Sequence, residues 1–404
     1  MSSLNILPKQ TDNKKRESNI ELLRIVCMVL IITHHCVLHG GAINMDFCVN
    51  KWFSIFLLPG GKICFDTFLA ISMWFLVDQS FKAERFAKIW IETLVYSLLF
   101  AYIAFLFGVQ FSKKDIISVF FPITGNVHGF AAAYLILYAL IPFLGIIVEK
   151  INKQQLQFLL CVLALSNIVT PVMGNLTGHF QKIFCNVGFW IFCYFLSLYL
   201  KKYSPKIVNK KIYLILLFIM CWMFIVILYV LKYLYPGTFI INYFITISTS
   251  HTSIPCIIGG YSLFFIFKGI KLPYIPLVNI FAKTTFGILM IHDHNFFRAP
   301  LWNQIIKTSE WYYSRFFVFR VGAAVAFIFF AAAVIDLLRI YLLEKNLFRI
   351  NKLQEIFKKM DEVLRTSCTT AKERGGGKCI LLLLQRVKLL YMVQEGLGVN
   401  ERKS

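Results

Sequence analysis

The chain has 404 residues, of which 58% are hydrophobic, 16% aromatic and only 15% charged. Soluble globular proteins carry about 25% charged residues, so this composition argues against a soluble enzyme. Lys and Arg number 42 against 20 Asp and Glu, which gives a net charge of +22. In so apolar a chain, this excess is typical of loops that flank membrane spans rather than of a nucleic-acid surface. The eleven cysteines show no zinc-type spacing and no clear disulfide framework.

Apolar stretches long enough to cross about 30 Å of hydrocarbon as helices recur along the chain. They predict an all-α, polytopic integral membrane protein with about ten transmembrane helices. The predicted spans are Ile20–Leu38, Ile63–Val77, Ile89–Val109, Val127–Val148, Leu156–Val172, Ile183–Leu200, Ile212–Tyr235, Ile254–Phe267, Leu277–Phe297 and Val321–Leu343. The second and eighth are short, and Trp52–Leu58 is interpreted as an interfacial or re-entrant piece that leads into the second.

The positions of the cations predict the orientation of the spans. The N-terminal tail is basic and alternate loops carry more Lys and Arg than the others, so we expect both termini to be cytoplasmic. The chain then divides into a basic tail over residues 1–18, a transmembrane domain over 19–345 and a cytoplasmic tail over 346–404. The apolar stretch in this last segment is too short to span the bilayer, and we expect the segment to be partly interfacial or disordered.

The first span contains Arg24, His34 and His35. A charge at the bilayer centre costs about 2.5 to 3.5 kcal/mol on insertion scales, so each such residue needs an explanation. Arg24 and His35 are eleven positions apart, which places them within about 20° on one helix face and roughly 16 Å apart along the axis. We therefore expect them to face one cavity, with Arg24 in the inner half. Snorkelling of Arg24 and a structural role for the histidine pair are the alternatives. Ser18 and Glu21 match a capping box.

Other polar residues are predicted at the depth of His35. Asp66 lies near the outer start of the second span, and His292, Asp293 and His294 lie at the outer end of the ninth. Histidine and aspartate can bind metal ions. However, His292 and His294 are about 200° apart on a helix and cannot both face one ion without a break. A hydrogen-bonded acid–base cluster is the simpler interpretation, and no metal site is predicted.

At the inner level, Arg85 and Lys88 occupy neighbouring positions of one helix face at the start of the third span. Their alternative role is that of ordinary positive-inside anchors.

Several motifs together resemble the membrane-bound acyltransferase family 3, and most closely its bacterial branch that O-acetylates surface polysaccharides. The most specific is Arg24, ten intervening residues and His35, within Glu21–Gly41. The others are Phe65–Ser72, Ala133–Tyr138, Pro142–Leu144, Phe281–Gly287 and Ile291–His294, and the resemblance extends from about Arg16 to Leu343. The chain departs from the family at Met73 and at His128-Gly129, and the second departure bears on acceptor specificity.

The resemblance implies ten spans, an acyltransferase activity and roles for particular residues. His35 corresponds to the catalytic histidine, and Arg24, Arg85 and Lys88 correspond to residues that bind the donor. The donor would be acetyl-CoA, used as a substrate rather than as a permanently bound cofactor. The acceptor would be a sugar hydroxyl of a cell-surface polysaccharide or of its lipid-linked precursor, at the bacterial cytoplasmic membrane.

We expect His35 to act as general base, because the imidazole pKa of about 6.5 suits proton transfer near neutral pH. Asp66 or Asp293 would orient the imidazole as a carboxylate does in a triad. An acetyl-histidine intermediate is an alternative.

Two interpretations from other classes compete with an enzyme. Buried His and Asp residues at one depth also suit the proton relay of a transporter or flippase for a sugar or a lipid-linked sugar. Many carriers have two halves with matching broken helices, and no such symmetry is evident here. A structural membrane protein whose polar residues only join helices leaves the shared face of Arg24 and His35 unexplained.

Overall fold

The computed structural model describes residues 16–169, 172, 186–203, 210–250 and 252–374, with side chains described as far as Leu364. Throughout these residues the regular structure is helical, so the predicted all-α class is confirmed. Six helices are long and apolar enough to cross a membrane, which confirms a polytopic membrane protein. They are α1 (Ser18–His39), α2 (Val49–Leu76), α3 (Ala83–Leu106), α5 (Gly129–Lys150), α9 (Lys211–Leu234) and the continuous segment Phe317–Leu347, which contains α15 (Phe317–Arg339) and α16 (Lys345–Leu347).

The remaining helices are shorter or, in the case of α17, polar. They are α4 (Lys113–Phe120), α6 (Lys153–Ala164), α8 (Asn186–Tyr203), α10 (Phe239–Ser248), α11 (Ile254–Lys268), α12 (Pro276–Lys283), α13 (Thr285–His292), α14 (Arg298–Pro300) and α17 (Asn351–Arg374). Each of the ten predicted spans overlaps at least one helix, but the ninth is two helices that meet at Thr284. The segment that joins the fifth and sixth predicted spans lies outside the described residues.

The prediction of a separate piece before the second span is wrong. Trp52–Leu58 forms the first turns of α2, which continues through Pro59 without a break. Apolar surroundings favour this continuity, because an unsatisfied backbone group costs several kcal/mol at membrane depth. The helix α2 therefore has 28 residues, more than the roughly 20 that a perpendicular span needs.

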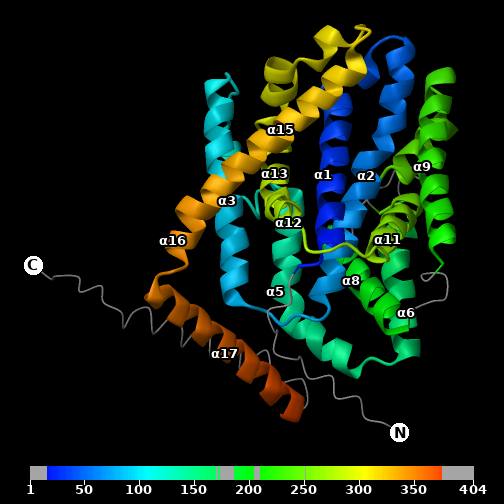
Figure 1. Cartoon of the computed structure of the whole chain (residues 1–404). Helices are drawn as coiled ribbons and strands as arrows, with labels where there is room; N and C mark the ends of the chain where they lie inside the picture. The colour runs from blue at the N-terminus through cyan, green and yellow to red at the C-terminus, as the bar shows by residue number, and fades with distance from the viewer. Residues whose placement is uncertain (1–15, 170–171, 173–185, 204–209, 251, 375–404) are drawn as a thin grey trace, which may run out of the picture.

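Helix α1 lies at the centre of the bundle, where it packs against α2, α11, α12, α13 and α15 (Figure 1). The approach of α1 to α2 is close at Gly61, where a Cβ atom would overlap the ring of His34. His34 itself is bound to α2, with its Nδ1 atom 2.7 Å from the Leu58 carbonyl oxygen. His34 therefore joins α1 to α2, which agrees for this residue with the structural role that was the alternative for the histidine pair.

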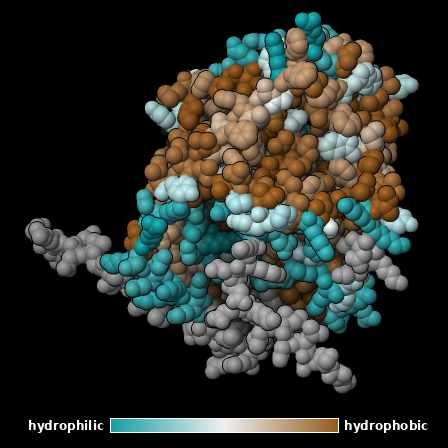
Figure 2. Space-filling model, in the orientation of Figure 1, coloured by the Kyte–Doolittle hydropathy of each residue, from teal (hydrophilic) through white to brown (hydrophobic). Residues whose placement is uncertain are grey.

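The surface separates an apolar belt from a hydrophilic end. In Figure 2 hydrophobic residues cover most of the upper part of the face in view, and hydrophilic residues gather at the lower end. The beginning of α1 and helix α17 both lie at this lower end (Figure 1). The two described ends of the chain are thus on one side of the bundle, which agrees with the predicted location of both termini in one compartment.

A buried ionic cluster joins α3 to α15. Arg339 contacts Glu92 at 3.1 Å, Asp336 at 2.8 Å and Glu344 at 3.1 Å, and the Tyr96 hydroxyl donates to Asp336 at 2.5 Å. Charges at membrane depth are costly unless they are paired, and here three carboxylates surround one guanidinium. The cluster fixes the position at which α15 crosses α3.

The beginning of the C-terminal tail is ordered against the bundle. Asp361 of α17 accepts a hydrogen bond from the Ala83 backbone N–H at the start of α3, at 2.7 Å. Phe348 and Phe357 bury their rings beside Ala83. Residues 375–404, for which an interfacial or disordered state was predicted, lie outside the described part of the chain.

Candidate active site

A cavity of about 310 Å³ lies beside the C-terminal half of α1. It takes residues from α1, α2, α5, α8 and α13 and from the segments that precede or follow them. His35, His39 and Asp293 line it together with Lys62 and Arg298. His128 also lines it, so the cavity collects titratable groups from four separate parts of the sequence.

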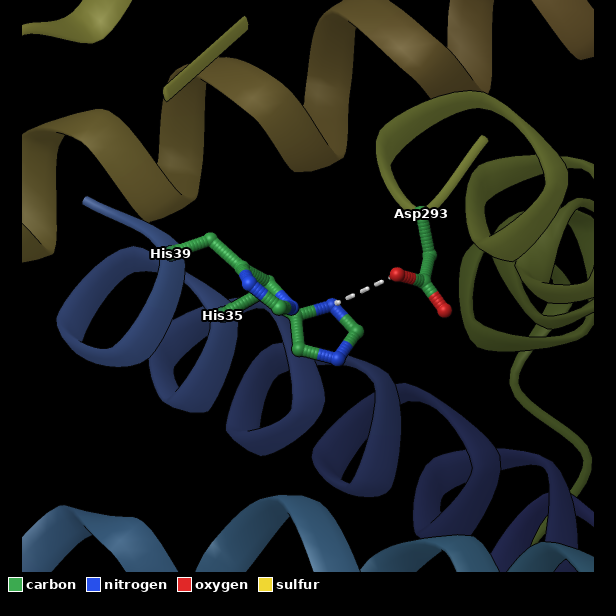
Figure 3. A group of neighbouring side chains, drawn as sticks. All are labelled: His35, His39 and Asp293. Carbon is green, nitrogen blue, oxygen red and sulfur yellow. Dashed lines mark ion pairs between the residues drawn. The ribbon is translucent and has the colours of Figure 1, made fainter. Parts of the chain in front are cut away.

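His35 faces a carboxylate across this cavity. Its Nδ1 atom is 3.8 Å from Asp293 Oδ1, and Figure 3 shows the ring of His35 on α1 turned toward Asp293, which directly follows α13. This separation exceeds a hydrogen bond, and His35 Nδ1 has no hydrogen-bond partner in the described structure. Catalytic hydrogen bonds are often long before substrate binds, so the arrangement suits an imidazole that a carboxylate orients on closure.

Asp293 is itself held by a cation. Arg298 Nη1 donates to Asp293 Oδ1 at 3.1 Å, five residues further along the chain. The same carboxylate oxygen thus lies between a guanidinium and the imidazole of His35. With Nδ1 directed at Asp293, the Nε2 atom of His35 is the nitrogen that can take a proton from a substrate.

Three further imidazoles lie near His35, and one of them is that of His34, with its ring centre 5.5 Å away. The ring of His39 lies 5.0 Å from that of His35, one helical turn later on α1, and the ring of His292 lies 5.2 Å from it. His292 Nδ1 is 2.6 Å from the Ile288 carbonyl oxygen, and its Nε2 atom has no partner in the described part of the chain. The sequence placed His35, His292 and Asp293 at one depth, and the structure brings these three together.

The other two predicted residues, Asp66 and His294, lie neither beside His35 nor in the cavity lining, and His292 approaches His35 without lining the cavity. Asp66 is 1% exposed, neither of its oxygens has a hydrogen-bond partner among described residues, and its Cβ lies where α2 meets Gly260 of α11. His294 Nδ1 accepts from the Phe296 and Phe297 backbone N–H groups. His294 Nε2 is 3.3 Å from the Ser97 carbonyl oxygen. Of the two candidates to orient His35, Asp293 is therefore the one in position.

His35, His39 and Asp293 could together offer three ligands to a metal ion, since their ligand atoms all lie within 4.8 Å of one another. Residues spaced i, i+4 on a helix plus a carboxylate are a usual donor set for zinc. Against this, Arg298 already pairs with Asp293, and both Arg298 and Lys62 lie within electrostatic range of His39. Two fixed cations beside the donor set oppose a dication, so the charge of the site favours an anionic occupant.

The N-terminal end of α1, which the sequence predicts to be its inner end, carries a second group of polar residues. Arg24 lies within electrostatic range of Glu21, Arg16 and Arg85. Arg85 Nη2 donates to the Tyr134 hydroxyl at 2.8 Å, and Arg85 Nη1 donates to Gln79 Oε1. Three guanidinium groups against one carboxylate leave this end positive, which suits the phosphates of a coenzyme.

Glu21 serves this group rather than the helix terminus, so the predicted capping box is wrong. Its carboxylate lies 3.5 Å from Arg16 and 3.8 Å from Arg24. The hydroxyl of Ser18 is engaged elsewhere, because it accepts hydrogen bonds from the Ile275 backbone N–H and the Asn279 side chain, both at 2.8 Å. The Ser18 hydroxyl thus binds groups at the start of α12 instead of capping α1.

Lys88 is directed away from Arg85 despite their spacing on one helix. It pairs with Glu84 at 2.9 Å and Glu344 at 3.7 Å, and its ammonium lies 5.2 Å from the centre of the Phe348 ring. The carboxylates of its neighbours therefore already compensate the charge of Lys88.

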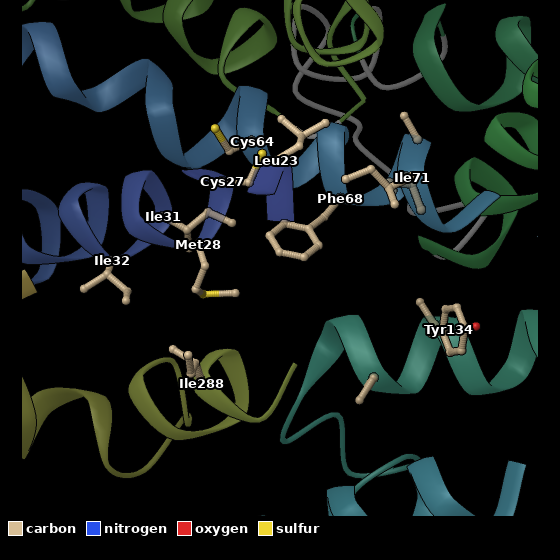
Figure 4. Packing of buried hydrophobic residues seen from close by; sticks show 14 of the residues in the cluster. Leu23, Cys27, Met28, Ile31, Ile32, Cys64, Phe68, Ile71, Tyr134 and Ile288 are labelled. Atoms are coloured by element: carbon tan, nitrogen blue, oxygen red, sulfur yellow. The ribbon is translucent and has the colours of Figure 1, made fainter. Parts of the chain in front are cut away.

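An apolar layer separates the two polar groups, so the expectation of one continuous cavity is not met. The cavity reaches Ile31 on α1 and does not include Arg24. Met28 and Ile31 lie between Arg24 and His35 on the same face, and they are 1% and 5% exposed. In Figure 4 the side chain of Met28 extends toward Ile288 of α13. Close packing by these residues, all in one buried core, closes the space.

Sequence reasoning did not find His39, Lys62 and Arg298. The i, i+4 spacing of His35 and His39 was a usable signal, because it places both rings on one face. Lys62 lies four residues before Asp66 and was counted only as a cation of an outer loop. Its position in the cavity depends on α2 being one continuous helix, whereas the sequence interpretation separated Trp52–Leu58 from the second span.

Comparison with known proteins gives one match. The family model for acyltransferase family 3, described as "Acyltransferase domain", matches residues 17–338. Neither the curated proteins nor the solved structures include a match to the chain. The matched segment contains both Arg24 and His35, the first five candidate spans, α15 as far as Leu338, and every residue of the cavity. The chain is therefore a multi-pass membrane protein that belongs to the membrane acyltransferase family 3, and it is an acyltransferase.

Proposed function

We propose that the protein transfers an acetyl group from cytosolic acetyl-CoA to a sugar hydroxyl of a cell-surface polysaccharide or of its lipid-linked precursor, at a bacterial cytoplasmic membrane. The single observation that carries this proposal is the position of His35, which faces Asp293 at 3.8 Å in a cavity large enough for part of a substrate. A base, its orienting carboxylate and an adjacent space are the parts that acyl transfer to an alcohol requires.

The inner end of α1 binds the coenzyme in this proposal. The phosphates of acetyl-CoA contact Arg24 and Arg85, whose planar forks match phosphate oxygens. The thioester then reaches outward along α1 to His35, past Met28 and Ile31. Because these two side chains fill the path in the described structure, they change rotamer or shift when the donor binds.

The chemical step follows from the orientation of His35. Its Nε2 atom takes the proton of the sugar hydroxyl while the oxygen attacks the thioester carbonyl carbon. The C–O bond forms, the C–S bond breaks, and the proton passes from the imidazolium to the departing thiolate of CoA. Asp293 stabilises the imidazolium and Arg298 holds Asp293 in place.

His35→Gln tests the assignment, because glutamine keeps a polar side chain of similar reach and cannot act as the base. Membranes that contain either form are incubated with labelled acetyl-CoA and an acceptor glycan, and the label in the glycan is counted. We expect a loss of at least about 100-fold, which is the usual contribution of a general base. Unchanged binding of CoA would show that the variant is folded. Normal label transfer by His35→Gln would refute the role of His35.

A further inference from the structure

The cavity beside His35 carries a positive charge that the proposed reaction does not use. Its lining contains one carboxylate, Asp293, and two permanent cations, Lys62 and Arg298. Arg298 pairs with Asp293 at 3.1 Å, and that pair is neutral as a unit. The cavity lining therefore contains no second carboxylate to balance the charge of Lys62.

The fold directs Lys62 into this space. The residue follows Gly61, at which α2 approaches α1 so closely that a side chain would overlap His34. Its ammonium lies within electrostatic range of Asp293, Asp66 and Arg298. Among the residues that the structure describes, no carboxylate forms an ion pair with Lys62, whereas Lys51, Lys88 and Lys201 all have hydrogen-bond or ion-pair partners.

An ammonium at such a site is costly while it lacks a counterion. Partial burial removes part of its hydration, and an ionic partner offsets that loss. An anion that enters the cavity would recover this energy, and it would do so within reach of the imidazole at which the acceptor is activated. A metal ion would instead face Lys62 and Arg298 as like charges.

The rest of the cavity wall fits a saccharide. Phe65, Phe130 and Trp190 supply aromatic surface, on which the apolar face of a sugar ring can lie. Thr252 and Asn295 supply hydrogen-bonding groups, and His128 Nε2 has no partner in the described structure.

We propose that the acceptor is an anionic saccharide, with a carboxylate or a phosphate close to the acetylated hydroxyl, and that Lys62 binds this anionic group. The inference rests on the proposed function, since it names the substrate class of the same site. The phosphates of the donor are not the anion in question, because the layer of Met28 and Ile31 separates Lys62 from Arg24 and Arg85.

The test compares three probes that share one sugar ring and differ at C6, where they carry a neutral hydroxymethyl group, a carboxylate or a phosphate: methyl glucoside, methyl glucuronide and methyl glucoside 6-phosphate. Their binding to the full-length protein in detergent is measured directly by saturation-transfer NMR, with Lys62→Gln, Lys62→Arg and Lys307→Gln as variants. Lys307 is an exposed lysine that pairs with Glu310 outside the cavity, so its variant removes the same charge elsewhere. Label transfer from acetyl-CoA to each probe is measured in parallel.

We expect the unsubstituted protein to bind at least one anionic probe about tenfold more tightly than the neutral probe, since a charge-assisted contact typically contributes this much. Lys62→Gln should lose the preference, while Lys62→Arg and Lys307→Gln should keep it. The carboxylate and phosphate probes then show which anion the site takes. Equal binding of all three probes, or a preference that persists in Lys62→Gln, would overturn the inference. Failure of label transfer with every probe would count against the proposed function, while the binding comparison would still decide the role of Lys62.

Discussion

The two ends of α1 present opposite kinds of polar environment. The inner end places Arg24 near Arg85 and Arg16, with Glu21 as the nearby carboxylate, and its excess of positive charge favours anions. The outer half places His35 between Asp293 and other imidazoles around a cavity, and can transfer protons. In the proposed function, one helix face thus joins an end that binds the donor to an end that carries out the reaction.

The apolar layer between these ends is as informative as the ends themselves. Helix periodicity puts Arg24, Met28, Ile31 and His35 on one face, yet the two in the middle are buried in the core. In the proposed reaction, this separation keeps the phosphates of the donor out of the acceptor cavity, so that each substrate has its own charged group.

Asp293→Asn should produce the largest effect after loss of His35 itself. Asparagine keeps the shape of the side chain but cannot stabilise an imidazolium, and we expect kcat for acetyl transfer to fall by about 100-fold or more. The KM for acetyl-CoA should stay within about twofold, because Asp293 lies beyond the apolar layer from the donor site. A variant with normal kcat would remove Asp293 from the reaction.

Met28→Trp tests whether the donor passes through the apolar layer. The larger ring would block the space between α1 and α13, and we expect acetyl transfer to fall more than tenfold while CoA still binds at the inner end. Leu216→Trp is the matched control, because Leu216 is 55% exposed on α9 and takes a bulky ring without overpacking. Full transfer by Met28→Trp would mean that the thioester reaches His35 by another route.

Lys88→Met should have the smallest effect. The carboxylates of Glu84 and Glu344 already pair with Lys88, and partly exposed ion pairs contribute about 1 kcal/mol or less. We therefore expect the KM for acetyl-CoA to change by less than about twofold, whereas Arg85→Gln should raise it about tenfold. Equal increases in the two variants would extend the donor site to Lys88.

Much of the fold followed from the sequence, because apolar runs of about 20 residues have few alternatives to a membrane helix. The interpretation of Trp52–Leu58 as a separate piece was wrong, because α2 continues through Pro59. Proline is tolerated inside such a helix where neighbouring helices satisfy the freed backbone groups. The capping box at Ser18 failed for a related reason, because Asn279 and Ile275 supply partners that local sequence does not contain.

The candidate site was predictable in part. The predicted direction of each span placed His35, His292 and Asp293 at one depth, and the structure brings them together. The predicted depth of a residue could not decide which way its side chain points around a helix, or where the chain goes after the helix ends. Asp66 turns toward α11 and His294 toward Ser97, and only tertiary packing sets these directions.

The central claim is that the inner end of α1 binds the donor and the outer cavity carries out the reaction. Its most direct test is the dissociation constant of CoA, measured on purified protein for Arg24→Gln and His35→Gln, beside kcat for acetyl transfer. We predict that Arg24→Gln weakens CoA binding about tenfold, as loss of a charge-assisted phosphate contact should. We predict that His35→Gln abolishes transfer and leaves the dissociation constant unchanged. Weakened CoA binding in His35→Gln together with unchanged binding in Arg24→Gln would contradict the account.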